Sequence, residues 1–165
     1  KTGEQFEEVD LNILLENTKT DFELLIAEKN AVIKHDVLPV IQGIALQLNQ
    51  LFLNLFSNSL KFSANNPVIT IVSKILSETE VSNHSFLHAK TRYVEIVFSD
   101  NGIGFEQQYA DQIFTIFQRL HDKKSYEGTG IGLALCKKIA DNHHGFITAK
   151  SDLGKGAAFY IYLPA

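Results

Sequence analysis

The chain has 165 residues, 45% of them hydrophobic, which is enough for one domain with a substantial core. Its 15 basic and 19 acidic residues give a net charge of −4, which argues against electrostatic capture of nucleic acid. No apolar run approaches the roughly 20 residues of a membrane span, so we expect no direct membrane contact by this domain. The single cysteine, Cys136, excludes an intrachain disulfide and is typical of a reducing compartment. The chain begins at Lys1 rather than at a methionine, and we expect it to be a piece of a longer protein.

The first half of the chain predicts two long helices separated by a short strand. Asp10 is a typical helix N-cap, and apolar residues follow it at near-helical spacing. Pro39 and Gly43 bracket a turn-rich connection. The expected segments are a loose polar lead-in over 1–9, a helix over 10–29, a strand over 31–34 and a helix over 45–62.

The second half of the chain alternates apolar and polar residues and predicts a sheet. Four strands are expected, over 68–75, 93–98, 146–150 and 157–163. We interpret the polar residues 76–92 as an exposed hairpin insert, in which Phe86 and Leu87 are candidates for contact with a partner.

Between the strands, residues 105–127 predict a mobile flap with a short helix near 110–117. A last helix is expected over 133–144. We expect the cation of His143 or His144 to suit the dipole at its end, and Gly145 to serve as its C-cap. The element order predicts a single domain, 1–165, with the fold of a two-layer α/β (α+β) sandwich. Its sheet would be mixed and mostly antiparallel, with helices on one face.

A stripe of mostly uncharged polar side chains runs along the helix predicted over 45–62. At 100° per residue, one narrow side of this apolar helix carries Gln47, Gln50, Asn54, Asn58 and Lys61. Half-buried amides need partners, because an unpaired buried polar group costs roughly 1–3 kcal/mol. Neutral oxygen ligands for Mg²⁺ and an ammonium for phosphate would explain the stripe, although an ordinary polar face is the alternative.

Two glycine-rich turns indicate a nucleotide site. Asp100-Asn101-Gly102-Ile103-Gly104 follows an apolar strand, and Gly128-Thr129-Gly130-Ile131-Gly132 precedes the last helix. In the first turn, the Asp100 carboxylate could accept a hydrogen bond from a base, and the glycines would let that base approach the backbone. In the second turn, the positive end of the helix could face phosphates. A plain turn and a plain flexible loop are the respective alternatives.

Together, four segments resemble the sequence boxes of sensor histidine kinases, in the same order. Residues 50–63 resemble the asparagine box, 100–105 the first glycine box, 113–121 the phenylalanine box and 128–139 the second glycine box. The resemblance extends over nearly the whole chain. It implies the Bergerat-type ATP-binding fold shared with gyrase, mismatch-repair and heat-shock chaperone ATPases, with 105–127 as the ATP lid.

The resemblance also implies a role for each matching residue. Asn58 would ligate Mg²⁺ with Asn54 beside it, Lys61 and Arg119 would contact phosphates, and Asp100 would recognise the adenine amino group. Phe114 and Phe117 would hold the base of the lid. The catalytic set would comprise Asn54, Asn58, Lys61 and Arg119. The nucleotide would be bound by Asn58, Lys61, Phe62, Asp100, Gly102, Ile103, Gly104, Phe114, Phe117, Arg119, Gly128, Thr129, Gly130, Ile131, Gly132 and Leu133.

One position distinguishes a kinase from an efficient hydrolase. The related ATPases carry a water-activating glutamate four residues before the magnesium asparagine, where this chain has Asn54. An amide cannot act as a general base near neutral pH. The sequence therefore favours a kinase domain that binds Mg-ATP and transfers the γ-phosphate to a histidine.

The expected partners follow from the same resemblance. The acceptor histidine would lie on a dimerisation domain outside this chain, and a response regulator receiver domain would act downstream. We expect this domain to be a cytoplasmic monomer with little transfer activity alone, and we expect no zinc site at His143 and His144. The alternatives are a catalytically silent nucleotide- or partner-binding pseudokinase module and a chaperone- or topoisomerase-type ATPase.

Overall fold

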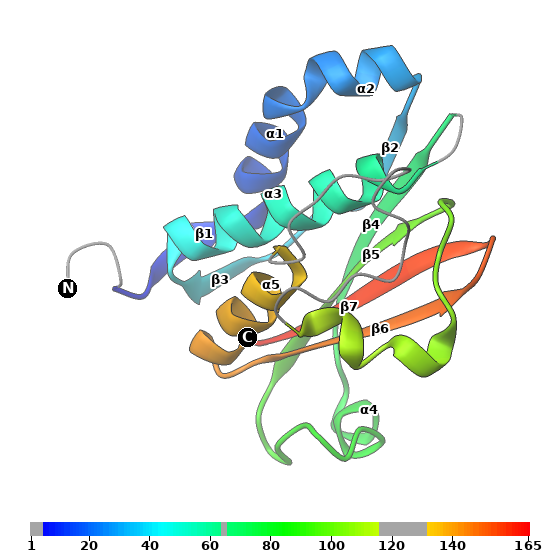
Figure 1. Ribbon diagram of the computed structural model, residues 1–165. Helices are drawn as coiled ribbons and strands as arrows, with labels where there is room; N and C mark the ends of the chain where they lie inside the picture. The colour runs from blue at the N-terminus through cyan, green and yellow to red at the C-terminus, as the bar shows by residue number, and fades with distance from the viewer. Residues whose placement is uncertain (1–4, 64–65, 116–131) are drawn as a thin grey trace.

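The computed structural model describes residues 5–63, 66–115 and 132–165 (Figure 1). Its helices are α1 (Leu11–Asp21), α2 (Glu23–Lys29), α3 (Ala45–Lys61), α4 (Glu78–Ser82) and α5 (Gly132–Asn142), with 3₁₀ turns η1 (Gln107–Tyr109) and η2 (Gln112–Phe114). Its strands are β1 (Glu7–Asp10), β2 (Val32–His35), β3 (Val40–Gly43), β4 (Val68–Ile75), β5 (Tyr93–Asp100), β6 (Phe146–Asp152) and β7 (Gly156–Pro164). Among the described residues, no helix is long and apolar enough to cross a membrane.

The main sheet has the strand order β2-β4-β5-β7-β6. The β2–β4 pair is parallel, and the other three pairs are antiparallel. Helices α1, α3 and α5 lie together on one side of this sheet (Figure 1). The predicted two-layer fold with a mixed, mostly antiparallel sheet is therefore confirmed.

The core lies between this sheet and helix α3. Strand β5 directs Val94, Ile96 and Phe98 toward the helices, because alternate residues of a strand face the same side. The ring of Phe52 on α3 meets that of Phe98 edge to face, with centroids 5.1 Å apart. α3 is thus held rigidly against the middle of the sheet, and its polar side is left for other contacts.

The N-terminal region differs from its prediction in two ways. Residues 7–9 belong to β1, which pairs with β3 as a separate two-stranded ribbon, so the expected loose lead-in is wrong there. The single helix expected over 10–29 is interrupted at Phe22, whose backbone leaves the helical region and whose ring stacks on Phe56. Packing of this ring against α3 explains the break. The helical periodicity of the sequence gives no sign of that contact.

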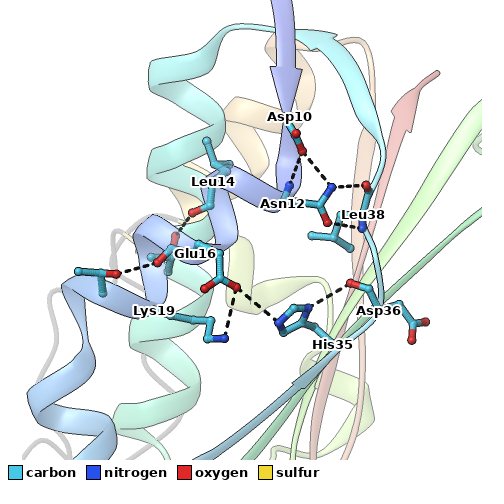
Figure 2. Close-up of polar contacts among 10 residues, drawn as sticks. Asp10, Asn12, Leu14, Glu16, Lys19, His35, Asp36 and Leu38 are labelled. Carbon is cyan, nitrogen blue, oxygen red and sulfur yellow. Dashed lines mark hydrogen bonds and ion pairs between the residues drawn. The ribbon is translucent and has the colours of Figure 1, made fainter.

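The start of α1 is fixed by the expected cap and by an amide that reaches another segment (Figure 2). The Asp10 carboxylate accepts a hydrogen bond from the Asn12 backbone N–H at 2.9 Å, as predicted for an N-cap. The Asn12 side chain both donates to the Leu38 carbonyl at 2.6 Å and accepts from the Leu38 N–H at 2.7 Å. The chain before β3 is thereby held against α1.

The insert between β4 and β5 is more ordered than its polar sequence suggests. It contains α4, which begins with a capping box between Ser77 and Glu80. Its apolar residues form a second hydrophobic cluster on the face of the sheet opposite α3, comprising Leu76, Val81, Leu87, Tyr93 and Tyr162. Leu87 is buried, and Phe86 packs on Phe146 with ring centroids 5.4 Å apart, so neither residue is the exposed contact we expected.

Replacing Leu87 with alanine is therefore expected to lower the free energy of unfolding by about 2–3 kcal/mol, the usual cost of truncating a buried leucine. Urea denaturation measures this loss. Leu24→Ala is the matched control, because Leu24 is 79% exposed and its truncation should change stability by less than about 0.5 kcal/mol. Equal effects of the two substitutions would show that the insert is not packed as described.

The end of α5 also departs from its prediction. His144 takes the left-handed conformation that ends the helix, with φ 59°, and the Gly145 N–H donates to the Ala140 carbonyl at 2.8 Å. Gly145 is needed for space rather than for its φ, since a Cβ there would lie 2.1 Å from the Tyr162 carbonyl oxygen. His143 is buried rather than solvated, and burial lowers its pKa, so it is not the helix-end cation we expected.

Candidate nucleotide site

Three segments converge at one end of α3. The Phe62 carbonyl accepts a hydrogen bond from the Ile103 N–H at 3.0 Å, which holds the turn after β5 against the end of the helix. Helix α5 runs antiparallel to α3, so its first residue, Gly132, lies near Asn54. The last two turns of α3 extend beyond this point. The predicted asparagine box and first glycine box are thus brought together with the start of α5.

Asp100 at the end of β5 is the ionisable group at the centre of this region. Its Oδ1 accepts hydrogen bonds from the backbone N–H groups of Gly102 (2.9 Å) and Ala157 (3.3 Å). Its Oδ2 accepts a third from the Ser59 hydroxyl at 3.2 Å. Burial raises the pKa of the Asp100 carboxyl above its ordinary value, and these hydrogen bonds oppose the rise. The carboxylate is therefore held in one orientation with spare acceptor capacity on Oδ2.

Ser59 belongs to the candidate site through its hydrogen bond to Asp100, and it was not among the residues predicted from the sequence. Its side chain is buried on α3 and connects the helix to the Asp100 carboxylate. The signal in the sequence was a hydroxyl on the otherwise apolar side of the helix. Only the pairing of α3 with the end of β5 gives that hydroxyl a partner.

The glycines of the first turn also have a packing role that the sequence did not predict. A Cβ on Gly102 would lie 2.4 Å from the Phe62 carbonyl oxygen, and one on Gly104 would lie 2.4 Å from the Asp152 carbonyl oxygen. Gly104 also has a φ of 64°. Both glycines therefore admit neighbouring protein backbone to close range. Gly156 is a third glycine that admits neighbouring backbone, and it was not predicted from the sequence. A Cβ at this position would lie 2.0 Å from the Asp100 carbonyl oxygen.

The polar stripe of α3 divides into two functional halves. Its first half contacts α5: the Gln47 side-chain oxygen Oε1 accepts from the Asn142 side-chain amide at 3.0 Å, and the Asn54 side-chain amide donates to the Gly132 backbone carbonyl at 3.4 Å. Gln50 is exposed and donates to Asn54 at 3.2 Å. Gln47 and Asn54 therefore help to join the two helices, a role that was not among the alternatives drawn from the sequence.

The second half of the stripe is available for a ligand. Asn58 is half-buried, and its side-chain amide makes no hydrogen bond to any other residue that the structure describes. The Lys61 side chain is exposed, one turn further along. The end of α3 that presents them is held by Lys29, whose ammonium donates to the Leu60 carbonyl at 2.7 Å. A neutral oxygen ligand and a cation thus lie together beside the turn that carries Asp100.

These side chains are suited to a hard cation bound with phosphates. Within the described parts of the chain, no cluster of three or more His, Cys, Asp or Glu side chains could hold a metal by itself. Mg²⁺ commonly uses few protein ligands and takes the rest from water and substrate phosphates. The Asn58 amide oxygen fits one such ligand position.

The predicted lid residues are placed only in part. Phe114 at the end of η2 is buried, and its ring meets Phe159 of β7 edge to face at 6.3 Å. Leu133 packs on the core from the first turn of α5, beside the exposed Gly132. The remaining predicted site residues lie outside the described residues: Phe117, Arg119, Gly128, Thr129, Gly130 and Ile131.

Comparison with known proteins agrees with this geometry. The model of the histidine kinase-, DNA gyrase B- and HSP90-like ATPase family matches residues 43–165, which include α3, the turn after β5 and α5. The chain belongs to this family. Domains of this family bind ATP, and this chain is accordingly a catalytic ATPase domain of the histidine-kinase type.

Sequence relatives of this histidine-kinase-type domain include a phytochrome and a sensory kinase. Cyanobacterial phytochrome A of Nostoc sp. is 45% identical over 142 residues, which is 84% of this chain. The adaptive-response sensory kinase SasA of Thermosynechococcus vestitus is 31% identical over 160 residues, or 95% of this chain. The matches cover only 16% of the phytochrome and 39% of SasA. The domain is thus similar to one part of much longer proteins.

Solved structures share the fold of the histidine-kinase-type domain. The catalytic domain of histidine kinase ThkA superposes with a TM-score of 0.76 at 22% identity, covering 97% of this chain and 95% of that one. The agreement therefore extends over nearly the whole fold.

Proposed function

We propose that this domain binds Mg-ATP at the end of α3 and donates the γ-phosphate to a histidine of a dimerisation domain, as the catalytic part of a sensor kinase. The observation that supports this most strongly is the convergence of Asn58 and Lys61, one turn apart on α3, with Asp100 at the end of β5, which lies far from them in the sequence. Together they supply a neutral oxygen ligand, a cation and a half-buried carboxylate near one end of α3.

Each of these groups has a distinct part in holding the nucleotide. The free acceptor capacity of Asp100 is suited to the exocyclic amino group of adenine. Lys61 would neutralise phosphate charge, and the N–H groups at the start of α5 would face the same phosphates. Asn58 would hold Mg²⁺, which neutralises charge on the transferring phosphate when bound. The domain would act mainly by positioning, and the partner would supply the reactive histidine.

Calorimetric titration of ATP into the domain, with and without Mg²⁺, tests the proposal. Micromolar binding that strengthens with Mg²⁺ is expected, and no binding at millimolar ATP would favour the pseudokinase alternative. Transfer of ³²P from ATP to a separately supplied dimerisation domain tests the proposed donation of the γ-phosphate to a histidine. Binding without transfer to any histidine-bearing acceptor would leave only a nucleotide-binding module.

A kinase rather than a hydrolase is expected from Asn54. Its amide is engaged with Gln50 and with the Gly132 carbonyl, and it has no basic lone pair at neutral pH. Steady-state ATP hydrolysis by the domain alone should therefore be far below the roughly 1–10 per second of a typical enzyme. The Asn58→Ala protein, purified identically, measures contaminating activity. Turnover near 10 per second that this substitution abolishes would support the chaperone-type alternative.

We also infer the surroundings in which the domain works. ThkA has been solved in complex with the response regulator protein TrrA, and we propose that a response regulator likewise acts downstream of this domain. ATP is cytoplasmic, so the domain would face the cytoplasm, and it would be monomeric without its dimerisation helices. Size-exclusion chromatography with light scattering checks the last point.

A further inference from the structure

Helix α3 is joined to α5 by polar contacts at both ends of their shared length. Asn54 reaches the Gly132 carbonyl at the end near the nucleotide site. At the opposite end there are two contacts: the Asn142 amide donates to the Gln47 side chain, and His143, directly after the last residue of α5, contacts Ile44, 10 residues before Asn54. The proposed function does not use this histidine, yet it is among the few buried polar residues of the described chain.

The His143 ring is hydrogen-bonded on both nitrogens. Nε2 accepts from the Ile44 backbone N–H at 2.9 Å, and Nδ1 lies 2.8 Å from the Ile139 carbonyl oxygen. Because a carbonyl can only accept, Nδ1 must carry the proton and the ring must be neutral. Ile44 is the N-cap residue of α3 and forms no side-chain cap. His143, which directly follows α5, thus accepts a hydrogen bond from the backbone N–H at the start of α3.

The surroundings of the ring favour this neutral form. The side chain is 2% exposed and lies against Gly43, where a Cβ would be 3.2 Å from the ring, and against Phe6, with ring centroids 5.3 Å apart. The titratable neighbour is His144 of the same segment, whose charge also lowers the pKa of His143, while burial is the largest cause. Protonation would place an Nε2–H against the Ile44 N–H and remove the acceptor. The contact between α3 and α5 would then lose one of its two hydrogen bonds at this end, leaving that between Asn142 and Gln47.

We propose that His143 is a positioning residue for the nucleotide site, and that its protonation weakens ATP binding by loosening α3 from α5. The inference rests on the proposed function, because the affected ligand groups are those of the ATP site. Asn58 lies roughly 20 Å along the helix from Ile44 at 1.5 Å per residue. A rigid helix that tilts by a few degrees about its core contacts moves its far end by about 1 Å, which is enough to weaken a site built on positioning.

The test compares the pH dependence of Mg-ATP binding in three proteins by calorimetry between pH 7.5 and 5.5. His143→Gln can keep both hydrogen bonds, because its amide accepts from Ile44 and donates to Ile139, but it does not titrate. His144→Gln is the matched control at the exposed neighbour. Titration of ATP itself affects all three proteins equally. Circular dichroism confines the comparison to pH values at which each protein is folded.

We expect the affinity of the wild type and of His144→Gln to fall about fivefold more over this range than that of His143→Gln. Parallel profiles for all three proteins would overturn the inference. A purely structural histidine would change stability with pH but not the affinity of the folded protein. Absence of ATP binding at every pH would instead refute the proposed function, so the two failures are distinguishable.

A measurement on the wild type alone covers the case in which His143→Gln does not fold. Linkage is reciprocal, so if protonation weakens ATP binding about fivefold, bound ATP must lower the pKa of His143 by about 0.7. NMR titration of the ring ¹⁵N signals, with and without nucleotide, measures both pKa values and the tautomer. An unchanged pKa, or a proton found on Nε2 at neutral pH, would overturn the inference.

Discussion

Changing Asp100 to asparagine is expected to weaken ATP binding by about 10- to 100-fold, the value of one hydrogen bond to a charged group. The two backbone N–H groups on Oδ1 require an acceptor there, so the asparagine carbonyl takes that position. The new NH₂ group then replaces Oδ2, near the Ser59 hydroxyl, which can rotate to accept from it. The NH₂ group would oppose the amino group of adenine, donor against donor.

The same substitution should alter base preference. The guanine O6 is an acceptor, so the ratio of ATP affinity to GTP affinity should fall, as competition calorimetry with both nucleotides would measure. Asp21→Asn removes an exposed carboxylate at the end of α1 and is the charge-matched control. An unchanged ATP to GTP ratio in Asp100→Asn would mean that this carboxylate does not contact the base.

Changing Asn58 to alanine is expected to remove the part of ATP affinity that depends on Mg²⁺. The structure leaves this amide without a hydrogen-bond partner among the described residues, so its loss creates no unpaired protein group. Removal of a metal ligand commonly costs tenfold or more in metal affinity, and we expect a loss of about 10- to 100-fold in the presence of Mg²⁺. Binding of ATP measured in EDTA should change little.

Asn49→Ala is the matched control for this prediction. Asn49 lies on the same helix, half-buried, on the side opposite Asn58 at 100° per residue. Its substitution should leave the response to Mg²⁺ intact, and urea denaturation of both variants separates ligand loss from unfolding. If Asn49→Ala and Asn58→Ala lost the same affinity with and without Mg²⁺, Asn58 would be a structural residue and not a metal ligand.

Local patterns were sufficient for the elements with strong periodicity. The predicted segments 68–75 and 45–62 match β4 and α3 to within one residue, because an alternating strand and an apolar helix carry their signal in every residue. The Asp10 cap was equally local, since its hydrogen bond closes within two residues. The sequence boxes in their order also indicated the family, which the match over residues 43–165 confirms.

Long-range contacts decided the rest. Residues 7–9 become a strand only because β3 lies beside them, and the polar insert is ordered because Tyr93 and Tyr162 offer it an apolar surface. The glycines of the first turn could be recognised from the sequence, but that Gly102 admits the Phe62 carbonyl could not.

The site shows the same division. The sequence by itself determined which residue types are present at the proposed ATP site, because Asn58, Lys61 and Asp100 stand in recognisable local patterns. The tertiary structure alone decided that Ser59 orients Asp100 and that a neutral His143 joins the start of α3 to the end of α5. Such hydrogen bonds connect residues 41 and 99 positions apart. No local propensity encodes them, since they form only when the core brings both partners out of water.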